Sequence, residues 1–279
     1  MSQPDAEVVR WSSSAPYWER HRNIIGHMFA PVSEALIEEA GVAPGNSVLD
    51  VATGPGEPAI RIAQFMGASG EVVGVDPVPG MIEAARREAA RLSLSNVHFE
   101  VAGADSLPFP NNRFDAVVSR FGIMFFPSPA AGVREMLRVL KPGRKVCFAV
   151  WSFGDANPFH SSLARVVYEY APPQPLPPDA PDAFRFATPG KLLTILKEAG
   201  CSNPAERLYR FAMDVPLSAE DFWSLRWDMS EKLRERLAAL PPDGLADLKG
   251  KAIEAFEQYS REGRLGFPGE VLLVSGSKF

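Results

Sequence analysis

The stretch from Val48 to Ala59 holds the residues best suited to binding a charged small molecule. It is an apolar strand that runs through a glycine-rich turn into a helix. Gly54 and Gly56 let a ligand lie against the backbone, because glycine has no Cβ and tolerates positive φ. Asp76 lies 20 residues after Gly56, at the end of the second predicted strand, where a carboxylate can accept hydrogen bonds from both ribose hydroxyls. The spacing indicates a nucleoside site.

Charge around the turn separates two kinds of nucleoside ligand. The run Gly54-x-Gly56-x-x-Ala59 also matches the dinucleotide fingerprint, whose pyrophosphate uses the bare positive end of a helix. Here Asp50 precedes the turn and Glu57 lies within it, and two carboxylates repel pyrophosphate. They suit a nucleoside that carries sulfonium and ammonium groups, as S-adenosylmethionine does. The pattern favours S-adenosylmethionine, with NAD as the alternative.

A parallel sheet is needed to bring these residues together. From Ser47 to Trp151 short apolar runs alternate with amphipathic stretches, which is typical of βαβ units. Such a doubly wound α/β sheet gathers the glycine turn and Asp76 at the carboxyl ends of its strands. The sequence predicts strands at 47–51, 71–75, 97–101, 116–119 and 145–151, and helices at 58–65, 81–91 and 131–140, the last ended by Lys141-Pro142-Gly143.

The flanks of this segment are expected to be mostly helical. Apolar spacing between Tyr17 and Ala40 predicts two helices broken near Pro31. The later part predicts a proline-rich loop at 172–181, a helix capped by Thr188 and ended at Ala199-Gly200, a strand at 208–215, helices from a capping box at Ser218 to about Tyr259, and a strand at 271–275. We expect one domain over 1–279, with a helical cover (1–45), a cofactor-binding half (46–152) and a second half (153–279) carrying a helical lid at about 216–262.

Four motifs appear in order between about residues 47 and 151. They are Val48-Leu49-Asp50-x-x-x-Gly54-x-Gly56, Gly74-Val75-Asp76-x-x-x-x-Met81, Leu107-Pro108-Phe109-Pro110 followed by Phe114-Asp115-Ala116-Val117, and Arg138-Val139-Leu140-Lys141-Pro142-Gly143. Together they resemble the class I S-adenosylmethionine-dependent methyltransferases, in the branch with the ubiquinone/menaquinone C-methyltransferases and many small-molecule O- and C-methyltransferases. The resemblance implies a Rossmann-like sheet of seven mostly parallel strands whose last strand is antiparallel.

The resemblance also assigns roles to single residues. Asp50 matches the residue that reaches the methionine ammonium, directly or through water, and Asp76 matches the ribose ligand. Gly103 stands where relatives carry an adenine-binding aspartate, so Asp105 is shifted from that place, while Ala104 keeps its amide. The cofactor site is thus expected at Asp50, Gly54, Gly56, Asp76, Pro77, Met81, Gly103, Ala104, Asp105 and Ser119.

The acceptor is less well defined by the sequence. Methyl transfer from a sulfonium depends mainly on positioning, and a base is optional. His160, His21 and His27 are candidates for such a base, and no catalytic residue is assigned. The quinone enzymes carry a Tyr-Asp-x-Met-Asn-Asp run near the N-terminus, and its absence from 15–28 weakens the case for a quinone acceptor. Aromatic residues outside the strands favour an apolar or aromatic acceptor, and we expect Phe222, Trp223 and Trp227 to shape its pocket.

Composition limits the partners and the location. The 279 residues carry 29 Lys and Arg against 34 Asp and Glu, a net charge of −5, which does not favour nucleic acid. Cys147 and Cys201 form no disulfide framework or metal-ligand pattern. No signal peptide or long apolar run is visible, so we expect a cytoplasmic protein without integral membrane association. The expected partner is a small-molecule acceptor, and the oligomeric state stays open. The remaining alternatives are an accessory module without catalysis and an NAD(P)-dependent oxidoreductase.

Overall fold

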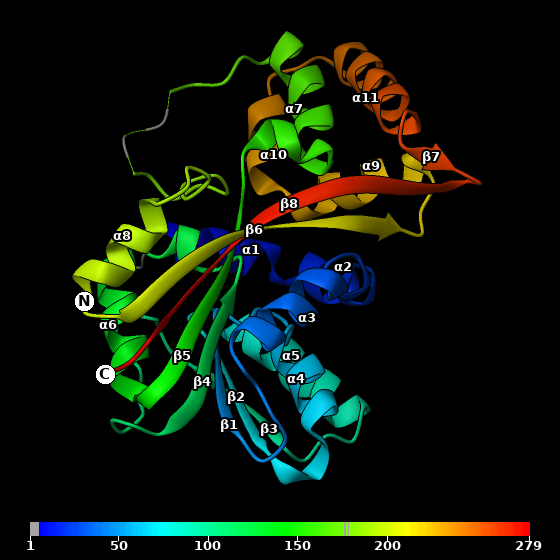
Figure 1. Cartoon of the computed structure of the whole chain (residues 1–279). Helices are drawn as coiled ribbons and strands as arrows, with labels where there is room; N and C mark the ends of the chain where they lie inside the picture. The colour runs from blue at the N-terminus through cyan, green and yellow to red at the C-terminus, as the bar shows by residue number, and fades with distance from the viewer. Residues whose placement is uncertain (1–5, 176, 178) are drawn as a thin grey trace.

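The computed structural model describes residues 6–175, 177 and 179–279, and within them one sheet of eight strands organises the chain (Figure 1). Predictions for residues 1–5, and for positions 176 and 178 of the proline-rich loop, lie outside the described residues. The strand order is β3-β2-β1-β4-β5-β8-β6, and β7 pairs with β8 beside this path. The strands are β1 (Ser47–Val51), β2 (Glu71–Asp76), β3 (Val97–Val101), β4 (Phe114–Arg120), β5 (Leu140–Trp151), β6 (Ser202–Val215), β7 (Ser260–Arg261) and β8 (Arg264–Ser277).

Strand direction confirms the expected fold class. Strands β1 to β5 pair in parallel, whereas β8 is antiparallel to both β5 and β6. The order reverses between β1 and β4, and such a switch point opens a crevice at the carboxyl ends of the two strands. In the register of these strands, Asp50 of β1 lies opposite Gly74 of β2 and Val118 of β4. The glycine turn therefore begins at the switch point.

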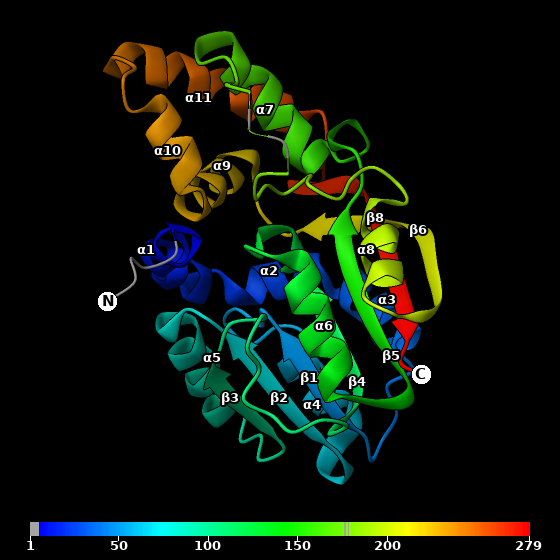
Figure 2. The same ribbon diagram turned by 90° about the vertical axis from the view of Figure 1, so that its left-hand side faces the viewer.

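Helices cover both faces of the sheet and extend beyond one end of it. Figure 1 shows α7, α9, α10 and α11 gathered over the long strands β6 and β8, and Figure 2 shows α1 between this helical layer and α5. The helices are α1 (Ala6–Arg20), α2 (Arg22–Met28), α3 (Ala30–Glu39), α4 (Ala59–Met66), α5 (Pro79–Arg91), α6 (Pro129–Val139), α7 (Pro158–Tyr170), α8 (Lys191–Glu198), α9 (Ala219–Met229), α10 (Glu231–Leu237) and α11 (Pro242–Glu257). No described helix combines the length and apolar character needed to span a bilayer.

Local signals explain most element boundaries. Ser218 caps α9 as expected, because its Oγ accepts a hydrogen bond from the Asp221 amide at 3.1 Å. The expected start of the helix at Thr188 is wrong. Helix α8 begins at Lys191, and the residue before it is Gly190, which has φ +85° and no side chain that could cap the helix. The segment after α6 is also corrected, because β5 begins at Leu140 and includes the turn residues expected to separate helix from strand.

The N-terminal and C-terminal flanks contain more elements than the sequence predicts. The N-terminal cover has three helices instead of two: the break at Phe29 agrees with the one expected near Pro31, and a further break at His21 separates α1 from α2. The segment after Ser218 likewise divides into α9, α10 and α11. Strand β6 is longer than expected because its first half is a polar edge, exposed on alternate residues and irregular between Ser202 and Ala205. These boundaries are set by tertiary contacts that local periodicity does not report.

Candidate cofactor site

A cavity of about 660 Å³ opens at the carboxyl ends of β1, β2 and β4. This volume lies in the range of small-molecule sites. The turn after β1, the ends of β2 and β3 and the segment after β4 form its base, while α1 and α2 supply the opposite wall. The cavity thus lies at the switch point of the sheet, where the topology predicts ligand binding.

Glycine is needed at the two positions of the turn for different structural reasons. Gly54 has φ +55°, and a Cβ built on it meets no heavy atom within 4 Å, so this part of the turn borders open space that a ligand can occupy. Gly56 has φ +108°, and a Cβ there would lie 2.7 Å from Cδ1 of Ile60. Both glycines line the cavity. Gly54 therefore admits a ligand, whereas Gly56 is also required by the packing of the turn on α4.

Asp76 connects the turn to the start of the next helix. Its Oδ2 accepts a hydrogen bond from the Gly54 amide at 3.0 Å, and its Oδ1 accepts one from the Val78 amide at 3.0 Å. The carboxylate lines the cavity, and burial raises its pKa to about 6. A carboxylate has about four lone-pair sites, so two are left for ligand donors. Asp76 is placed where a ribose hydroxyl pair can reach it.

Asp50 lies behind the turn, outside the wall of the cavity. Its side chain is fully buried, and Oδ2 accepts a hydrogen bond from the Ala59 amide at 3.1 Å, at the N-terminus of α4. Oδ1 has no hydrogen-bond partner among the described residues. Burial raises the pKa of Asp50 to about 7, and the positive charge of Arg120 partly opposes this rise. The carboxylate therefore supports the turn from below.

The residues expected around adenine gather at one end of the cavity. Pro77, Met81, Gly103, Ala104 and Asp105 all line it, with Met81 buried and Asp105 exposed. A Cβ on Gly103 would lie 2.9 Å from Oδ1 of Asp105, so the Asp105 carboxylate lies over this glycine. The departure from the family pattern at Gly103 thus makes room for the shifted carboxylate.

The end of β4 carries Ser119, which is expected in the cofactor site, and Arg120, which the sequence does not predict to be there. Ser119 is fully buried, lies outside the wall, and its Oγ has no hydrogen-bond partner in the described part of the chain. Arg120, the last residue of β4, does line the cavity although its side chain is almost entirely buried. The signal for Arg120 in the sequence is its place at the carboxyl end of a central strand, where the ligands of such sheets bind.

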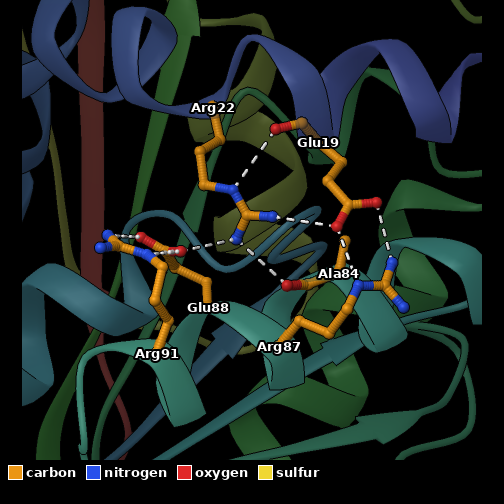
Figure 3. A network of polar contacts seen from close by, with 6 residues as sticks. All are labelled: Glu19, Arg22, Ala84, Arg87, Glu88 and Arg91. Atoms are coloured by element: carbon orange, nitrogen blue, oxygen red, sulfur yellow. Dashed lines mark hydrogen bonds and ion pairs between the residues drawn. The ribbon is translucent and has the colours of Figure 1, made fainter.

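Helix α1 covers the cavity and is fixed to α5 by a network of charges (Figure 3). Arg87 donates two hydrogen bonds of 2.8 Å to the Glu19 carboxylate. Arg22 lies 3.3 Å from both Glu19 and Glu88 and donates to the Ala84 carbonyl at 3.1 Å. The same carboxylates have lowered pKa values because of their arginine hydrogen bonds. The network holds the wall of the cavity in one position.

Aromatic side chains form another part of the cavity lining. Phe121 stacks on Trp151 with ring centroids 4.5 Å apart, and Phe29 meets Phe121 edge-on at 5.3 Å. Trp11 of α1 meets Phe125 edge-on at 5.1 Å. Such a wall can hold a flat apolar molecule by burial and ring contacts. The aromatic side chains that line the cavity are Trp11, Trp18, Phe29, Phe121, Phe125 and Phe126.

Three aromatic residues expected in the acceptor pocket lie elsewhere. Phe222 is fully buried against Phe256 and Phe267, with ring centroids 4.8 Å and 5.2 Å away. Trp223 and Trp227 stack on one another at 5.7 Å on the side of α9 that faces α11. None of the three lines the cavity. The expectation is corrected, because α1 intervenes between the cavity and the helical layer, to which it is bound through contacts such as His21 to Asp228 at 2.9 Å.

The histidines occupy three different environments. His27 lines the cavity, and its Nε2 lies 2.6 Å from Oδ2 of Asp214. His160 is enclosed by Trp151, Phe159 and Phe184 outside the cavity wall, and burial, followed by the charge of Arg226, holds its pKa well below the ordinary value. His21 pairs with Asp228 at the edge of α1. His27 is thus the histidine placed to meet an acceptor.

Comparisons with known proteins agree with this geometry. A family model described as a methyltransferase domain matches residues 48–143. The ubiquinone/menaquinone biosynthesis C-methyltransferase UbiE of Ectopseudomonas mendocina is 38% identical over 136 residues, covering 48% of this chain and 52% of that protein. The UbiE of Pseudomonas putida strain GB-1 is 35% identical over 193 residues, covering 68% of each chain.

The sequence alignments with several relatives cover only part of each chain, whereas the structural superposition covers most of it. The chain matches about half the length of the E. mendocina protein. The crystal structure of YcgJ from Bacillus subtilis superposes with a TM-score of 0.57 at 20% identity, covering 88% of this chain and 97% of that one, and shows the same fold. The longer UbiE alignment and the matched domain show the family. The chain belongs to the S-adenosylmethionine-dependent methyltransferases, among the relatives of the ubiquinone/menaquinone C-methyltransferases.

Proposed function

We propose that this chain transfers a methyl group from S-adenosylmethionine to an oxygen or carbon atom of a small, apolar or aromatic acceptor. The observation that carries the proposal is the cavity at the switch point, which Asp76, the glycine turn and a group of aromatic side chains line together. Its volume of about 660 Å³ leaves room beside a nucleoside for a second small molecule. The UbiE relatives support the activity, and their partial alignment leaves the acceptor open.

The residues present fit the cofactor. Asp76 offers carboxylate oxygens for the ribose, and Gly54 leaves open space at the turn. Pro77 and Met81 provide apolar surface for the adenine, beside the amide of Ala104. When bound, the cofactor supplies a methyl group that its sulfonium already activates. The chain contributes orientation and exclusion of water, which can provide much of the rate of such a displacement.

The aromatic wall supports an apolar acceptor. Phe29, Phe121 and Phe125 line the cavity and contact other aromatic rings there. An acidic hydroxyl or carbon of the acceptor could transfer its proton to His27, whose Nε2 is oriented by Asp214 at 2.6 Å. A phenol or an enol would meet both requirements, because it has apolar surface for these rings and an acidic proton for His27. We therefore propose phenolic or enolic acceptors.

Two alternatives are less well supported. An NAD(P)-dependent oxidoreductase is not supported by the matched methyltransferase domain or by the UbiE relatives. A binding module without catalysis would need space for the cofactor alone, and the cavity of about 660 Å³ leaves room beside a nucleoside for an acceptor. We also propose that the chain acts as one domain in the cytoplasm, with the segment 216–262 as a brace for α1.

Two measurements test the proposed function. Calorimetry should show binding of S-adenosylhomocysteine and none of NADH, and the reverse result contradicts the cofactor assignment. Transfer of a labelled methyl group from S-adenosylmethionine should then be assayed against matched panels of phenols, enols, quinols and aliphatic amines. Labelling of phenols or enols supports the proposal. Cofactor binding without transfer to any panel member favours the accessory module.

A further inference from the structure

Strand β6 forms one edge of the sheet. It is 14 residues long and pairs with β8 on its inner side, and Figure 2 shows it at the border of the sheet. Among the described residues, no strand pairs with its outer side, and the main chain between 205 and 211 makes no hydrogen bond beyond those to β8. Unpaired N–H and C=O groups along an edge are a template on which another strand can pair.

The opposite edge of the sheet differs in length and in cover. Strand β3 has only five residues, and its Phe99 carbonyl accepts hydrogen bonds of 3.1 Å and 2.6 Å from Nε and Nη2 of Arg86. A short strand and a charged side chain at an edge both reduce pairing with another chain. On β6, no side chain of the described residues hydrogen-bonds to the main chain between 205 and 211. The chain thus leaves the longer of its two sheet edges open.

The open segment 205–211 carries charges of both signs in a symmetric arrangement. Leu208 is its central residue, with Glu206 two positions before it and Arg210 two positions after it. Because side chains alternate along a strand, these three lie on the same face. Leu208 is 42% exposed and the Arg210 side chain is 76% exposed. Pro204, which has no N–H for a ladder, precedes the segment and limits it on that side.

An antiparallel copy of this segment, related by a two-fold axis at Leu208, brings opposite charges together. Glu206 of each copy then lies opposite Arg210 of the other, and the two Leu208 side chains meet at the axis. An axis at Arg210 would instead place Arg210 opposite its own copy and Glu206 opposite Asp214, and an axis at Glu206 would place two glutamates opposite one another. Like charges directly opposite are destabilising. On this face of the strand, charge therefore selects the axis at Leu208.

The charged side chains of the segment are positioned within the chain and keep capacity for such a contact. Arg210 donates its Nε–H to Glu270 at 2.9 Å, and its Nη groups make no hydrogen bond within the described part of the chain. The Glu206 carboxylate accepts the Gly190 amide at 2.9 Å and 3.1 Å. A carboxylate has about four lone-pair sites and a guanidinium has five N–H donors, so both can form a further charged hydrogen bond.

We propose that a second copy of this chain pairs antiparallel with β6 along 205–211, with the two-fold axis at Leu208, so that the two sheets join edge to edge. The contact uses the same surface on both copies, and it therefore closes as a dimer and leaves no open β6 edge. A peptide of another protein is the other occupant that an open edge can take. The self-complementary charges of Glu206 and Arg210 favour the second copy. The inference does not depend on the cofactor or on the acceptor.

A cysteine at the axis tests the position of the contact. Sedimentation of the full chain should show a dimer, and mild oxidation of Leu208→Cys should link it covalently. The two thiols lie directly opposite one another, at a Cα separation of about 4.5–5.5 Å that a disulfide can span. The native Cys147 and Cys201 are buried. The matched control is Ala212→Cys, which is exposed on the same strand, and whose two thiols would lie about 27 Å apart and stay unlinked.

Exchange of the two charges tests the register. Glu206→Arg and Arg210→Glu should each raise the dissociation constant of the dimer by at least about 10-fold, because each places like charges opposite one another twice. The variant with both substitutions restores opposite charges and should return to within about 3-fold of the wild type. Glu206→Arg also removes the contact with Gly190, which the second substitution does not restore. Recovery of the dimer therefore reports the charge pair rather than the fold of the monomer.

A third substitution and its control complete the test. Leu208→Lys places two cations at the axis and should also weaken the dimer by at least about 10-fold. Val101→Lys changes an apolar residue of the opposite edge strand that is 49% exposed, and should leave the dimer unchanged. A wild-type monomer at every concentration overturns the inference, and so does a covalent dimer of Ala212→Cys or a charge exchange without recovery. None of these outcomes bears on cofactor binding, so the proposed function is tested separately.

Discussion

Two regions of the molecule use buried side chains differently. At the carboxyl ends of β1 and β4, four buried polar atoms of the described chain lack a hydrogen-bond partner, on Asp50, Thr53, Ser119 and Arg120. In the helical layer of α7, α9 and α11 over β8, aromatic side chains pack with almost no exposed surface, as Phe222 does. An unpartnered buried polar group is unfavourable in isolation. The first region therefore gathers unpartnered polar groups next to the cavity. In the second, the phenylalanine rings complete their contacts with one another, although Nε2 of His160 on α7 also has no hydrogen-bond partner among the described residues.

This comparison gives a rule for reading mutations. A change to a residue that lines the cavity at the switch point, such as Asp76, should act mainly on ligand binding, because its side chain borders the space that a ligand can occupy. A change in the helical layer should act mainly on the free energy of unfolding, because its aromatic side chains are packed against one another. Each prediction below tests whether the two effects separate in this way.

The largest expected effect is on stability in the helical layer. Phe222→Ala removes a fully buried ring that contacts Phe159, Phe256 and Phe267. We expect it to lower the free energy of unfolding by about 3–5 kcal/mol, the usual effect of such a cavity. Urea unfolding measures this loss, and Phe65→Ala on α4, where the ring is 56% exposed, is the control. A fall in S-adenosylhomocysteine affinity for the folded variant would contradict the separation.

The second prediction concerns Asp50 and pH. Its pKa in the folded protein is about 7 because of burial, and its ordinary value is 3.8. Between about pH 4 and pH 7 the folded state therefore binds more protons than the unfolded state, so this carboxylate lowers stability as pH rises. Arg120 and Glu57 are the charged groups that face it. Asp50→Asn removes the titration and keeps an oxygen for the Ala59 amide.

The expected result is a pH-dependent difference between the two proteins. In the absence of ligand, the free energy of unfolding of the variant should rise relative to that of the wild type, by on the order of a few kcal/mol between pH 4 and pH 7.5. Urea unfolding at several pH values measures this difference, and a constant difference contradicts the raised pKa. The same variant should bind S-adenosylmethionine more weakly while adenosine affinity stays nearly unchanged. Equal losses for both ligands would make Asp50 a support of the turn alone.

The sequence predicts the first region far better than the second. Strands β1 and β3 begin and end where periodicity predicts, and the glycine turn and Asp76 line the cavity as expected. This half of the sheet is built from short apolar strands and regular crossovers, in which local pattern and tertiary structure agree. Its ligand-binding edge follows from topology, because parallel strands present their carboxyl ends together.

The parts of the fold and of the cavity that the sequence does not predict depend on contacts between distant segments. Nothing in the local pattern shows that Trp11 of α1 reaches Phe125, or that α1 separates Trp223 from the cavity. The importance of Arg120 was likewise hidden, because a charged residue at the end of a strand resembles an ordinary surface residue until its burial is known. Packing of helices on a sheet fixes these relations, and periodicity alone does not contain them.

The third prediction tests the ligand-binding region directly. Asp76→Ala removes the acceptor for the Gly54 and Val78 amides and the expected acceptor for the ribose. We expect S-adenosylhomocysteine binding to weaken by about 1.5–3 kcal/mol, the usual contribution of hydrogen bonds to a charged group. Calorimetry measures this loss. Asp76→Asn, which keeps one acceptor oxygen, should lose less. Unchanged affinity in Asp76→Ala would remove the ribose role.

The smallest expected effect compares two neighbouring tryptophans. Trp223 is 5% exposed whereas Trp227 is only partly buried, and they stack outside the cavity. Trp223→Leu should therefore lower the free energy of unfolding by about 1–2 kcal/mol, and Trp227→Leu by less. Both variants should keep the cofactor affinity and the acceptor KM of the wild type. Thermal unfolding and steady-state kinetics measure the two properties separately.

A change in acceptor KM with normal stability would give the opposite conclusion. It would mean that α9 approaches the acceptor when α1 moves, as the sequence-based expectation of a lid over 216–262 requires. The contacts of α1 with Asp228 and Glu231, made by Arg20 and Ser13, argue for a fixed brace, because they bind this helix to α9 and α10 on one side while Arg87 binds it to α5 on the other. A helix held on both sides stabilises the cavity wall in one position. Substitution of the two tryptophans should therefore change the free energy of unfolding rather than the acceptor KM.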